Sequence, residues 1–593
     1  MHKLSPIPDK HSRPNDNRLP RSASAASLVR DKRHNIPPKV DYQVKQLLSL
    51  NSIFEFIEQK RKPDSYESQF TLLRPSITQP NLEERTIMKK KPSSPSVPTS
   101  VSVREESGQT PSRIEKDSMG EMHVPANALW GASTQRAVQN FPIGNLKPQS
   151  TLISALALIK AAAAQANLQL NDLDAIRAKS IIAAAKQVAD GTYDDHFVVG
   201  LFQTGSGTST NMNANEVIAA LTKQSLSRGG AKKTQNTAAQ TTVVVHPNDH
   251  VNMGQSSNDV IPTAIHVAVT VEIAARLIPA LQTLQDGLSE KAAQYRTAIK
   301  TGRTHLQDAT PVTFGQEFEA YASQISTCIK RLNNLLEGLS SVALGGTAVG
   351  TGINTRETFA TLALRNLSRL VNSRHKTKLR FREAPNHLAA QGSIDSLVDA
   401  AGVLQTLSTA LIKIANDIRW MASGPRAGLN EILLPAIQPG SSIMPGKVNP
   451  VICEALMQVG YRTLGNCQTV VYATQSSNFE LNVALPVVSY SLLESLQLLS
   501  DAVVVFREKC LDGLTPTSTG ADLVERGLAL CTALAPVVGY DLAASIAKEA
   551  DSTGETILAV ALRRTQLDRS QLEKLLDPMT MTRPGLSGVK LAQ

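Results

Sequence analysis

Aromatic side chains are scarce in this sequence of 593 residues, of which only 4% are Phe, Trp or Tyr. Strands favour aromatic and β-branched residues, whereas Ala and Leu, which are abundant here, favour helices. Apolar residues at 41% and charged residues at 19% are ordinary for a globular protein. The composition therefore predicts a mostly α protein, and the length predicts several domains or a large helical core.

Cysteines are few, and their spacing argues against the usual cysteine-based sites. They are odd in number, and no two form a C-x-x-C pair: Cys328, Cys453, Cys467, Cys510 and Cys531. A disulfide framework or a zinc site is therefore not expected, and an intracellular location in the cytoplasm or mitochondrial matrix is. The polar loops described below also lack a metal-like cluster of Asp, His and Cys, so neither a metal nor a cofactor is expected.

Long uninterrupted apolar runs are lacking as well, because Lys or Glu interrupts each candidate. A helix needs about 20 mostly apolar residues to cross a bilayer. The N-terminus also has no apolar segment typical of a secretory signal. The sequence therefore predicts no membrane association.

The net charge of +10 is concentrated near the start of the chain, where residues 1–112 hold 19 Lys and Arg against 12 Asp and Glu. This Pro- and Ser-rich segment has no recognition motif, so nucleic-acid binding is not expected. Its composition cannot bury enough apolar surface to fold, which predicts a disordered or targeting extension. Asp9, Asp16 and Asp31 are unusual in a mitochondrial presequence, so both alternatives stay open.

From about residue 113 the apolar pattern predicts helices, at 150–168, at 212–224 and then in four long stretches. The long stretches are 262–297, 314–343, 393–420 and 450–506. In 393–420 the apolar positions recur in steps of three and four, which places one stripe on a helix face. The stripe contains Ile394, Leu397, Ala401, Leu404, Leu407, Leu411, Ile414 and Ile418. We expect an N-terminal domain (113–250), a central long-helix bundle (251–512) and a small helical C-terminal domain (513–593).

The most informative break in this pattern is the segment PGSSIMPGKVNP, residues 439–450. Its glycines and prolines exclude a helix, and Asn449-Pro450 is typical of a helix start, with Asn449 as N-cap. The positive end of the following helix, together with Lys447, would suit a carboxylate. The alternative is a flexible connector between helices.

Three further polar loops interrupt the helices. Segment 301–318 contains His305, which suits proton transfer near neutral pH, although a lone His is more often structural. Segment 254–264 supplies Ser256, Ser257 and Asn258, of which an N-cap role explains one. Segment 203–216 contains Gly205 and Gly207, which would let the backbone approach a ligand, although a capped turn is the simpler interpretation. Together the loops predict a lyase or isomerase of a small carboxylic acid.

GSSIMPGKVNP resembles the signature loop of the fumarase/aspartase superfamily, and the other three loops resemble its remaining blocks. The similarity begins near Arg113 and covers roughly four-fifths of the chain. The resemblance implies three mostly α domains, with the long helices of four subunits forming a twenty-helix core. It also implies a homotetramer in which three subunits share each active site.

Within that superfamily the chain is similar to the class II fumarases, which hydrate fumarate to L-malate without a metal. The resemblance implies that Ser441 is the base and that His305, oriented by Glu454, acts through a water. The implied substrate-binding residues are Ser206, Gly207, Thr208, Ser256, Ser257, Asn258, Thr304, Ser442, Lys447, Val448 and Asn449. A secondary dicarboxylate site is implied at His246, Pro247, Asn248 and Asp249, although Val243 stands where some fumarases have a basic residue. The segment 225–245 is longer than usual and is expected to be a mobile surface loop.

Two alternatives remain within the same resemblance. Aspartate ammonia-lyases share the serine loop, but Gly446, NFELNV (478–483) and IANDIRWMASGPR (414–426) favour the fumarases. A non-catalytic structural protein on the same fold would be expected to have lost Ser441, Lys447 or His305. All three are present.

Overall fold

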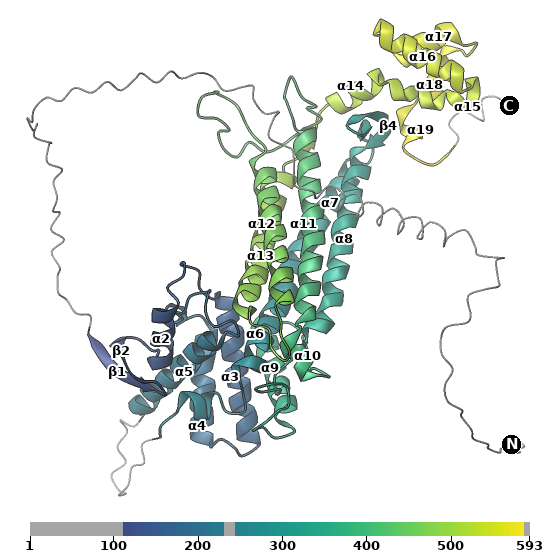
Figure 1. The fold of residues 1–593 in the computed structure, drawn as a ribbon. Coiled ribbons are helices and arrows are strands. Elements are labelled where there is room, and N and C mark those ends of the chain that lie inside the picture. The colour runs from purple at the N-terminus through teal and green to yellow at the C-terminus, as the bar shows by residue number, and fades with distance from the viewer. Residues whose placement is uncertain (1–110, 230–242, 586–593) are drawn as a thin grey trace, which may run out of the picture. The chain divides into compact units, whose positions relative to one another are not determined.

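The computed structural model of the protein describes residues 111–229 and 243–585, and these are mostly helical, as predicted (Figure 1). The predicted extension lies almost wholly outside the described residues, as does most of segment 225–245. The few strands form two-stranded sheets, which connect helices rather than building a core.

The first part of the described chain is a hairpin followed by packed helices. Its elements are β1 (Ser112–Asp117), β2 (Gly120–Pro125), α2 (Ala132–Asn140), α3 (Ser150–Gln169), α4 (Ala175–Ala189), η1 (Asp194–His196), α5 (Thr208–Gly229) and η2 (Pro247–Val251). The helix predicted at 150–168 is confirmed as α3. Buried residues, many of them alanines, lie on nearly every face of this helix. The helix predicted at 212–224 is the inner part of the longer α5.

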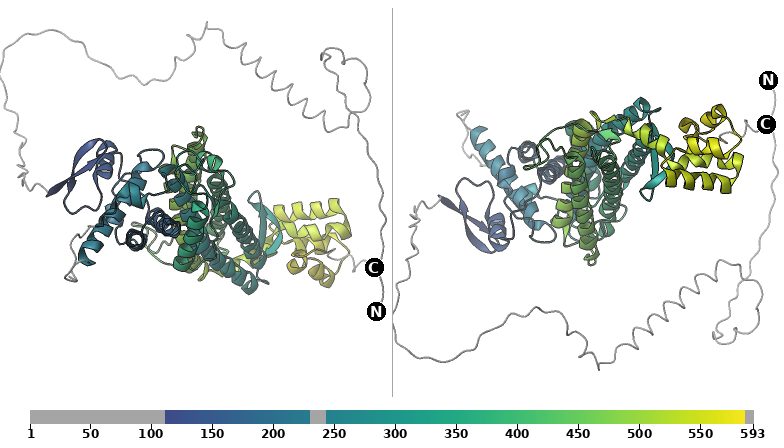
Figure 2. Two further views of the ribbon diagram at one scale, coloured as in Figure 1. Left: turned by 90° about the horizontal axis from the view of Figure 1, so that it is seen from below. Right: turned by 90° about the horizontal axis from the view of Figure 1, so that it is seen from above.

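The long helices lie side by side in a bundle, as the end-on views show (Figure 2). They are α6 (Ser257–Glu272), η3 (Ile273–Leu277), α7 (Ile278–Gln294), α8 (Phe314–Leu339), α11 (Asp395–Met421), α12 (Val451–Gln475), α13 (Leu485–Phe506) and η4 (Arg507–Leu511). Shorter elements connect them: β3 (Ile299–Thr304), β4 (Gln307–Thr313), β5 (Ser341–Val342), α9 (Phe359–His375), β6 (Arg382–Glu383), α10 (His387–Gly392) and β7 (Ile432–Leu433). The apolar stripe predicted in 393–420 is confirmed, because each of its members is buried.

Two predictions in this region are wrong. The stretch 450–506 is not one helix, because residues 476–484 form a turn between α12 and α13. There, an Asn482 side-chain oxygen accepts a hydrogen bond from the Ala484 amide and replaces the helical bonding pattern. The segment 301–318 is not an irregular loop either. It forms most of the β3–β4 hairpin and the start of α8, because the two strands pair from Ile299 with Thr313 to Thr304 with Gln307 and the paired base of the hairpin is largely buried.

The C-terminal part is small and helical. It contains β8 (Thr515–Pro516), α14 (Thr519–Arg526), η5 (Leu528–Ala533), α15 (Ala535–Val538), α16 (Tyr540–Thr553), α17 (Ile557–Arg564), α18 (Arg569–Leu575) and α19 (Pro578–Met581). Its buried apolar residues, from Val524 to Leu576, form a cluster of their own. A single larger cluster runs from Leu129 to Leu514 and crosses position 250, so the first part and the long helices share one core.

The expectation that no segment is long and apolar enough to cross a bilayer is wrong when helices are judged by their length and composition alone. Four described helices qualify on that basis: Ser150–Gln169, Ser257–Gln294, Asp395–Met421 and Leu485–Leu511. An isolated charge such as Lys160 does not remove the apolar character of a helix. In the first two, 78% of the apolar window is buried inside the protein, against 44% and 56% in the others. Packing in the helical core is sufficient to explain the composition of the first two.

Candidate active site

The predicted site residues fall into two groups at opposite ends of the long helices. Figure 1 shows α5 at one end and β4 at the other. The helical run from Ser257 to Gln294 contains 38 residues, which corresponds to about 55 Å at 1.5 Å per residue. Within a single chain, the loops at 203–207 and 254–258 therefore lie far from the β3–β4 hairpin and from residues 439–450.

Contacts along α13 support the same separation. The amide of Leu485, at the start of α13, donates to the carbonyl of Gly205 at 2.9 Å. At the far end, Cys510 Sγ lies 3.7 Å from Cys453 Sγ, in the first turn of α12. The 27 residues from Leu485 to Leu511 span about 40 Å as a helix. Residues 439–450 directly precede α12, so they lie that far from Gly205.

The first group consists of two polar turns that meet through their hydroxyls, and we call it the hydroxyl cluster (Ser206, Gly207, Thr208, Ser256, Ser257 and Asn258). Thr208 Oγ1 lies 2.8 Å from Ser206 Oγ and 2.8 Å from Ser257 Oγ. Gly207 has a φ of 71°, and a Cβ there would lie 2.9 Å from an Ile261 methyl. This glycine therefore lets the turn before α5 meet the start of α6. The predicted residues of two distant segments are brought together.

The structure requires glycine at position 205 for a different reason from the one predicted. A Cβ at this position would lie 1.7 Å from the Val483 carbonyl oxygen. The close approach that the glycine permits is thus to the chain's own turn before α13, not to a ligand.

The start of α6 is rigidly capped, as expected for one of its three polar residues. Ser256 is the N-cap and accepts a bond from the Asn258 amide at 3.2 Å, while Asp259 accepts one from the Ser256 amide at 2.9 Å. Ser257 and Asn258 are left to other roles, and Asn258 Nδ2 donates to the Ala348 carbonyl. The reciprocal cap fixes the backbone from which the Ser257 hydroxyl projects.

Residues 439–450, here called the Ser441 loop, form the second group with the β3–β4 hairpin. The Ser441 hydroxyl oxygen accepts bonds from the backbone amides of Ile443 at 3.2 Å and Met444 at 2.9 Å. Such a turn is common for serine, but two N–H donors on one oxygen also stabilise negative charge on it. Sequence reasoning missed these two amides, because backbone donors leave no signal in residue identities.

Asn449 closes the Ser441 loop instead of capping the helix. The predicted N-cap is off by one residue, since α12 begins at Val451 with Pro450 as N-cap. Asn449 Nδ2 donates to the Gly440 carbonyl at 2.7 Å, and the Gly440 amide donates to the Lys447 carbonyl at 2.7 Å. Lys447, Val448 and Ser442 are exposed on this loop. Within residues 111–229 and 243–585, the Lys447 ammonium has no bonding partner, so it is available to an anion.

His305 lies at the tip of the β3–β4 hairpin. His305 and Leu306 have φ values of 57° and 58°, which make the tight turn between Thr304 and Gln307. The imidazole and the Thr304 side chain are exposed. In the described part of one chain no hydrogen bond joins His305 to Glu454, so the predicted pairing remains a prediction.

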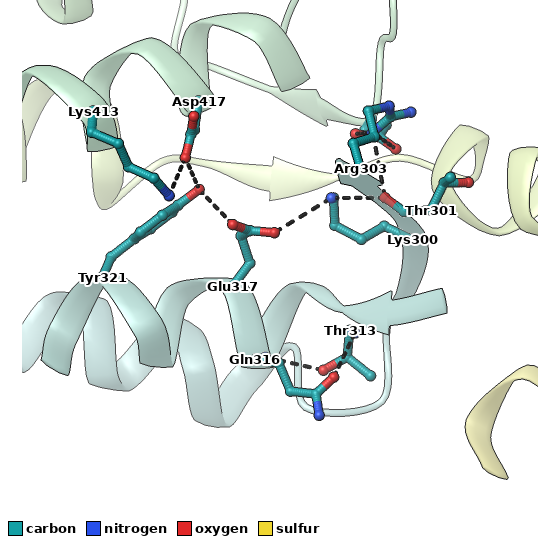
Figure 3. Close-up of polar contacts among 10 residues, drawn as sticks. Lys300, Thr301, Arg303, Thr313, Gln316, Glu317, Tyr321, Lys413 and Asp417 are labelled. Atoms are coloured by element: carbon teal, nitrogen blue, oxygen red, sulfur yellow. Dashed lines mark hydrogen bonds and ion pairs between the residues drawn. The ribbon is translucent and has the colours of Figure 1, made fainter. Parts of the chain in front are cut away.

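The base of the hairpin is held by a polar network that joins β3, α8 and α11 (Figure 3). Lys300 Nζ lies 3.5 Å from a Glu317 carboxylate oxygen, and the Tyr321 hydroxyl lies 2.9 Å from Glu317 and 3.1 Å from Asp417. Burial and the two adjacent carboxylates raise the pKa of Tyr321 far above its usual value. Arg303, two residues before His305, also pairs with the fully buried Glu431 at 2.9 Å. A rigid base therefore carries an exposed tip.

The predicted secondary dicarboxylate site is a short helical turn whose polar groups already bond one another. His246 Nδ1 accepts from the Asp249 amide at 3.2 Å, and the His246 amide donates to His250 Nδ1 at 2.8 Å. His246 and Asp249 are exposed, and Val243, His246 and Pro247 line a surface groove. Asn248 is exposed at the same turn. Nothing in this geometry tests whether a dicarboxylate binds here.

The described residues contain no group of three or more His, Cys, Asp or Glu side chains placed to hold an ion. The predicted residues at the far end instead present the exposed Lys447 ammonium, the exposed His305 imidazole and the Ser441 hydroxyl with its two amide donors.

A bundle of long helices, with polar loops at both ends and a small helical part next to the β3–β4 hairpin at one end, is the architecture of the fumarase/aspartase type of lyase. Comparison with known families agrees: residues 120–465 match the lyase family, and residues 530–583 match the fumarase C C-terminus. The chain belongs to the class II fumarate hydratase family.

Similar proteins carry that name. Class II fumarate hydratase of Xylella fastidiosa is 48% identical over 475 residues, which cover 80% of this chain and 96% of the relative. The Mycobacterium tuberculosis enzyme is 46% identical over 476 residues, with coverage of 79% and 96%. A crystal structure of recombinant class II fumarase from Schistosoma mansoni superimposes with a TM-score of 0.75 at 35% identity, covering 80% of this chain and 100% of that one. The predicted resemblance to the class II fumarases is thereby confirmed.

Proposed function

We propose that the protein catalyses the reversible hydration of fumarate to L-malate. The observation that carries this proposal is the Ser441 hydroxyl, which accepts two backbone N–H bonds on a loop that also presents the Lys447 ammonium. An ordinary serine hydroxyl is far too weak a base to remove a carbon-bound proton. Two amides and a nearby cation stabilise the alkoxide and so make it a usable base.

In the direction from malate, Ser441 takes the C3 proton, and the electron pair moves into the neighbouring carboxylate to give an aci-carboxylate. Lys447 and the start of α12 stabilise the charge that develops there. His305 then protonates the leaving C2 hydroxyl through a water, and its orientation is assigned to Glu454. The hydroxyl cluster binds a substrate carboxylate through neutral donors.

We also propose that the active protein is a homotetramer in which three chains complete each site. The hydroxyl cluster lies about 40 Å or more from the Ser441 loop within one chain, so one chain cannot present both to a molecule as small as malate. Loops from neighbouring chains would bring the two ends together. The partly exposed apolar windows of α11 and α13 supply surface for such an assembly. Its location is proposed to be intracellular, with cytoplasm and mitochondrial matrix both open.

The function is tested by following fumarate absorbance with the purified full-length protein. L-malate should give fumarate without added metal or cofactor, and the rate should not change with chelator. L-aspartate should be inert, because a pocket built for a hydroxyl leaves polar groups unpaired against an ammonium. Ammonia-lyase activity in place of malate conversion would overturn the assignment, and inactivity towards both substrates would favour a structural protein.

The assembly is tested separately by measuring the mass of the protein in solution. A tetramer is expected. A fully active monomer would contradict the shared site.

A further inference from the structure

Lys160 is an unusual residue in the middle of α3, because its side chain is fully buried although it carries an ammonium. Its one hydrogen bond among the described residues goes to Asn252 Oδ1 at 2.8 Å. Burial lowers the pKa of Lys160 to about 7, and the charge of Asp259 opposes that shift. A buried cation is costly and is usually retained only where it has specific partners.

Asn252 gathers three donors on one oxygen. Besides Lys160, Asn211 Nδ2 and Asn215 Nδ2 both donate to Asn252 Oδ1 at 3.2 Å. Asn211 and Asn215 lie on α5, three and seven residues after Thr208. The Asn252 side chain in turn donates to the Gln255 carbonyl at 3.0 Å, immediately before Ser256. This single side chain therefore joins α3, α5 and the turn that leads to α6.

Asp259 makes the second connection. It is fully buried, and its carboxylate accepts bonds from the backbone amides of Ser256, Gly345 and Thr347 at 2.9 to 3.0 Å. Lys160 is the opposite charge that acts on it inside the same core. The helices α3, α5 and α6 pack against one another (Figure 1). The two charges and Asn252 thus lie in the core shared by the helices that carry the hydroxyl cluster, and they are bonded to α5 and to the turn before α6.

We propose that Lys160 is a positioning residue for substrate binding. It acts through Asn252 and Asp259 to keep the Ser206–Thr208 turn and the Ser256–Asn258 turn at a fixed distance from each other. The contact between Thr208 Oγ1 and Ser257 Oγ joins the two turns at the surface. Lys160, Asn252 and Asp259 fix the spacing of the two turns from within the core. This inference rests on the proposed function, because it assumes that the hydroxyl cluster receives a carboxylate.

A purely structural lysine would predict something different. Removing it would lower thermal stability without changing the binding of substrate by the molecules that remain folded. A positioning residue for the hydroxyl cluster predicts weaker binding, whereas the proton transfer at Ser441 and His305 changes little. Measuring whether the substitution changes KM or kcat therefore distinguishes a structural lysine from a positioning residue.

The experiment compares Lys160→Met with Lys291→Met in the full-length protein. Lys291 is a matched control, since it is also buried but donates to the carbonyls of Asp512 and Leu514 at the other end of the bundle. Lys160→Met should raise KM for malate about tenfold or more while kcat stays within about threefold. Lys291→Met should lower the melting temperature and leave KM within about twofold of wild type. A folded Lys160→Met protein with the wild-type KM would overturn the proposal.

Lys160→Met could fail to fold, because it leaves Asp259 buried without a counter-charge. Asn211→Ala and Asn215→Ala each remove one arm of the network and leave the Lys160–Asn252 bond intact. Each should raise KM by about threefold, with the melting temperature near that of wild type. Wild-type KM values in both would also refute the positioning role.

Failure of the proposed function would look different from failure of this inference. If wild-type protein does not convert malate, binding of succinate, an unreactive dicarboxylate, is measured by calorimetry instead. Succinate should bind to wild type and about tenfold more weakly to Lys160→Met or, where that protein does not fold, about threefold more weakly to Asn211→Ala. Equal affinities would reject the inference whatever reaction the protein catalyses.

Discussion

The two ends of the long helices are built in opposite ways. The hydroxyl cluster is supported by its own chain: Ser206 is buried, Thr208 contacts two other hydroxyls, and a cap fixes the start of α6. Among the described residues, the Ser441 loop makes hydrogen bonds within itself and to the first turn of α12, and Ile443 and Met444 beside the Ser441 hydroxyl are 84% and 49% exposed. The hydroxyl cluster is thus held in place by its own chain. The Ser441 loop exposes apolar side chains, which a neighbouring chain would cover in the proposed tetramer.

The largest expected effect comes from the exposed end. Ser441→Ala should reduce kcat by about 10²- to 10⁴-fold, because it removes the proposed general base, and should leave folding unchanged because the side chain is partly exposed. Steady-state kinetics and a thermal melt measure the two quantities. Ser442→Ala is the neighbouring control and should affect KM more than kcat. More than about a tenth of wild-type kcat in Ser441→Ala would mean that another group is the base.

A mixing experiment tests whether the two ends belong to different chains. Ser441→Ala damages one end, and Thr208→Val damages the other. At a malate concentration well below the raised KM of Thr208→Val, each variant alone should be nearly inactive. Co-assembly of the two should restore up to about a quarter of wild-type activity at that concentration, since random tetramers contain sites with both ends intact. Each variant mixed with itself is the control. Absence of recovery in tetramers shown by mass to be mixed would place both ends of a site in one chain.

His305 and Glu454 test the exposed end further. His305→Asn should reduce kcat by about 10- to 100-fold, and Glu454→Gln should cause a loss that overlaps with it, because the two are proposed to form one relay. The double variant should then be little worse than His305→Asn. Independent, multiplying losses in the kinetic double-mutant cycle would separate the two residues.

The smallest expected effect concerns the β1–β2 hairpin, which is distant from both ends in sequence. The Arg136 guanidinium donates two bonds to the Asp117 carboxylate and holds the pKa of Asp117 below its usual range. Because the folded-state pKa is lowered, this stabilisation is present above pH 3.8, the ordinary Asp value, and is lost as the pH falls through the lower folded value. Asp117→Asn should speed amide exchange in the hairpin by no more than about threefold at pH 7.

The matching measurement is hydrogen exchange of β1 and β2 in wild type and Asp117→Asn across a pH series. The ratio of the two rates should approach one in acid, and kcat should be the same in both proteins. A ratio that grows in acid would show that the Arg136 pairing is not the cause.

The sequence predicted most of the helices for a simple reason. The stripe from Ile394 to Ile418 recurs at the helical period, and burial of that face requires the helix that was observed. The end of α12 was missed because apolar stretches flank the turn, VVYA at 470–473 and LPVV at 485–488. The Asn482 bonds show where the helical pattern is interrupted. The hairpin that carries His305 was missed because strand pairing depends on a partner strand, which a local pattern does not reveal.

By itself, the sequence determined the helical class, the apolar faces and the residue types that a carboxylate site requires, since these follow from local periodicity and side-chain chemistry. Tertiary structure alone decided that Ser206, Thr208 and Ser257 touch, that Lys160 and Asp259 are buried, and that the Ser441 oxygen meets two amides. It also placed the Ser441 loop far from the hydroxyl cluster. Helix lengths and packing set these distances, and they involve residues too far apart along the chain for any local pattern to relate them.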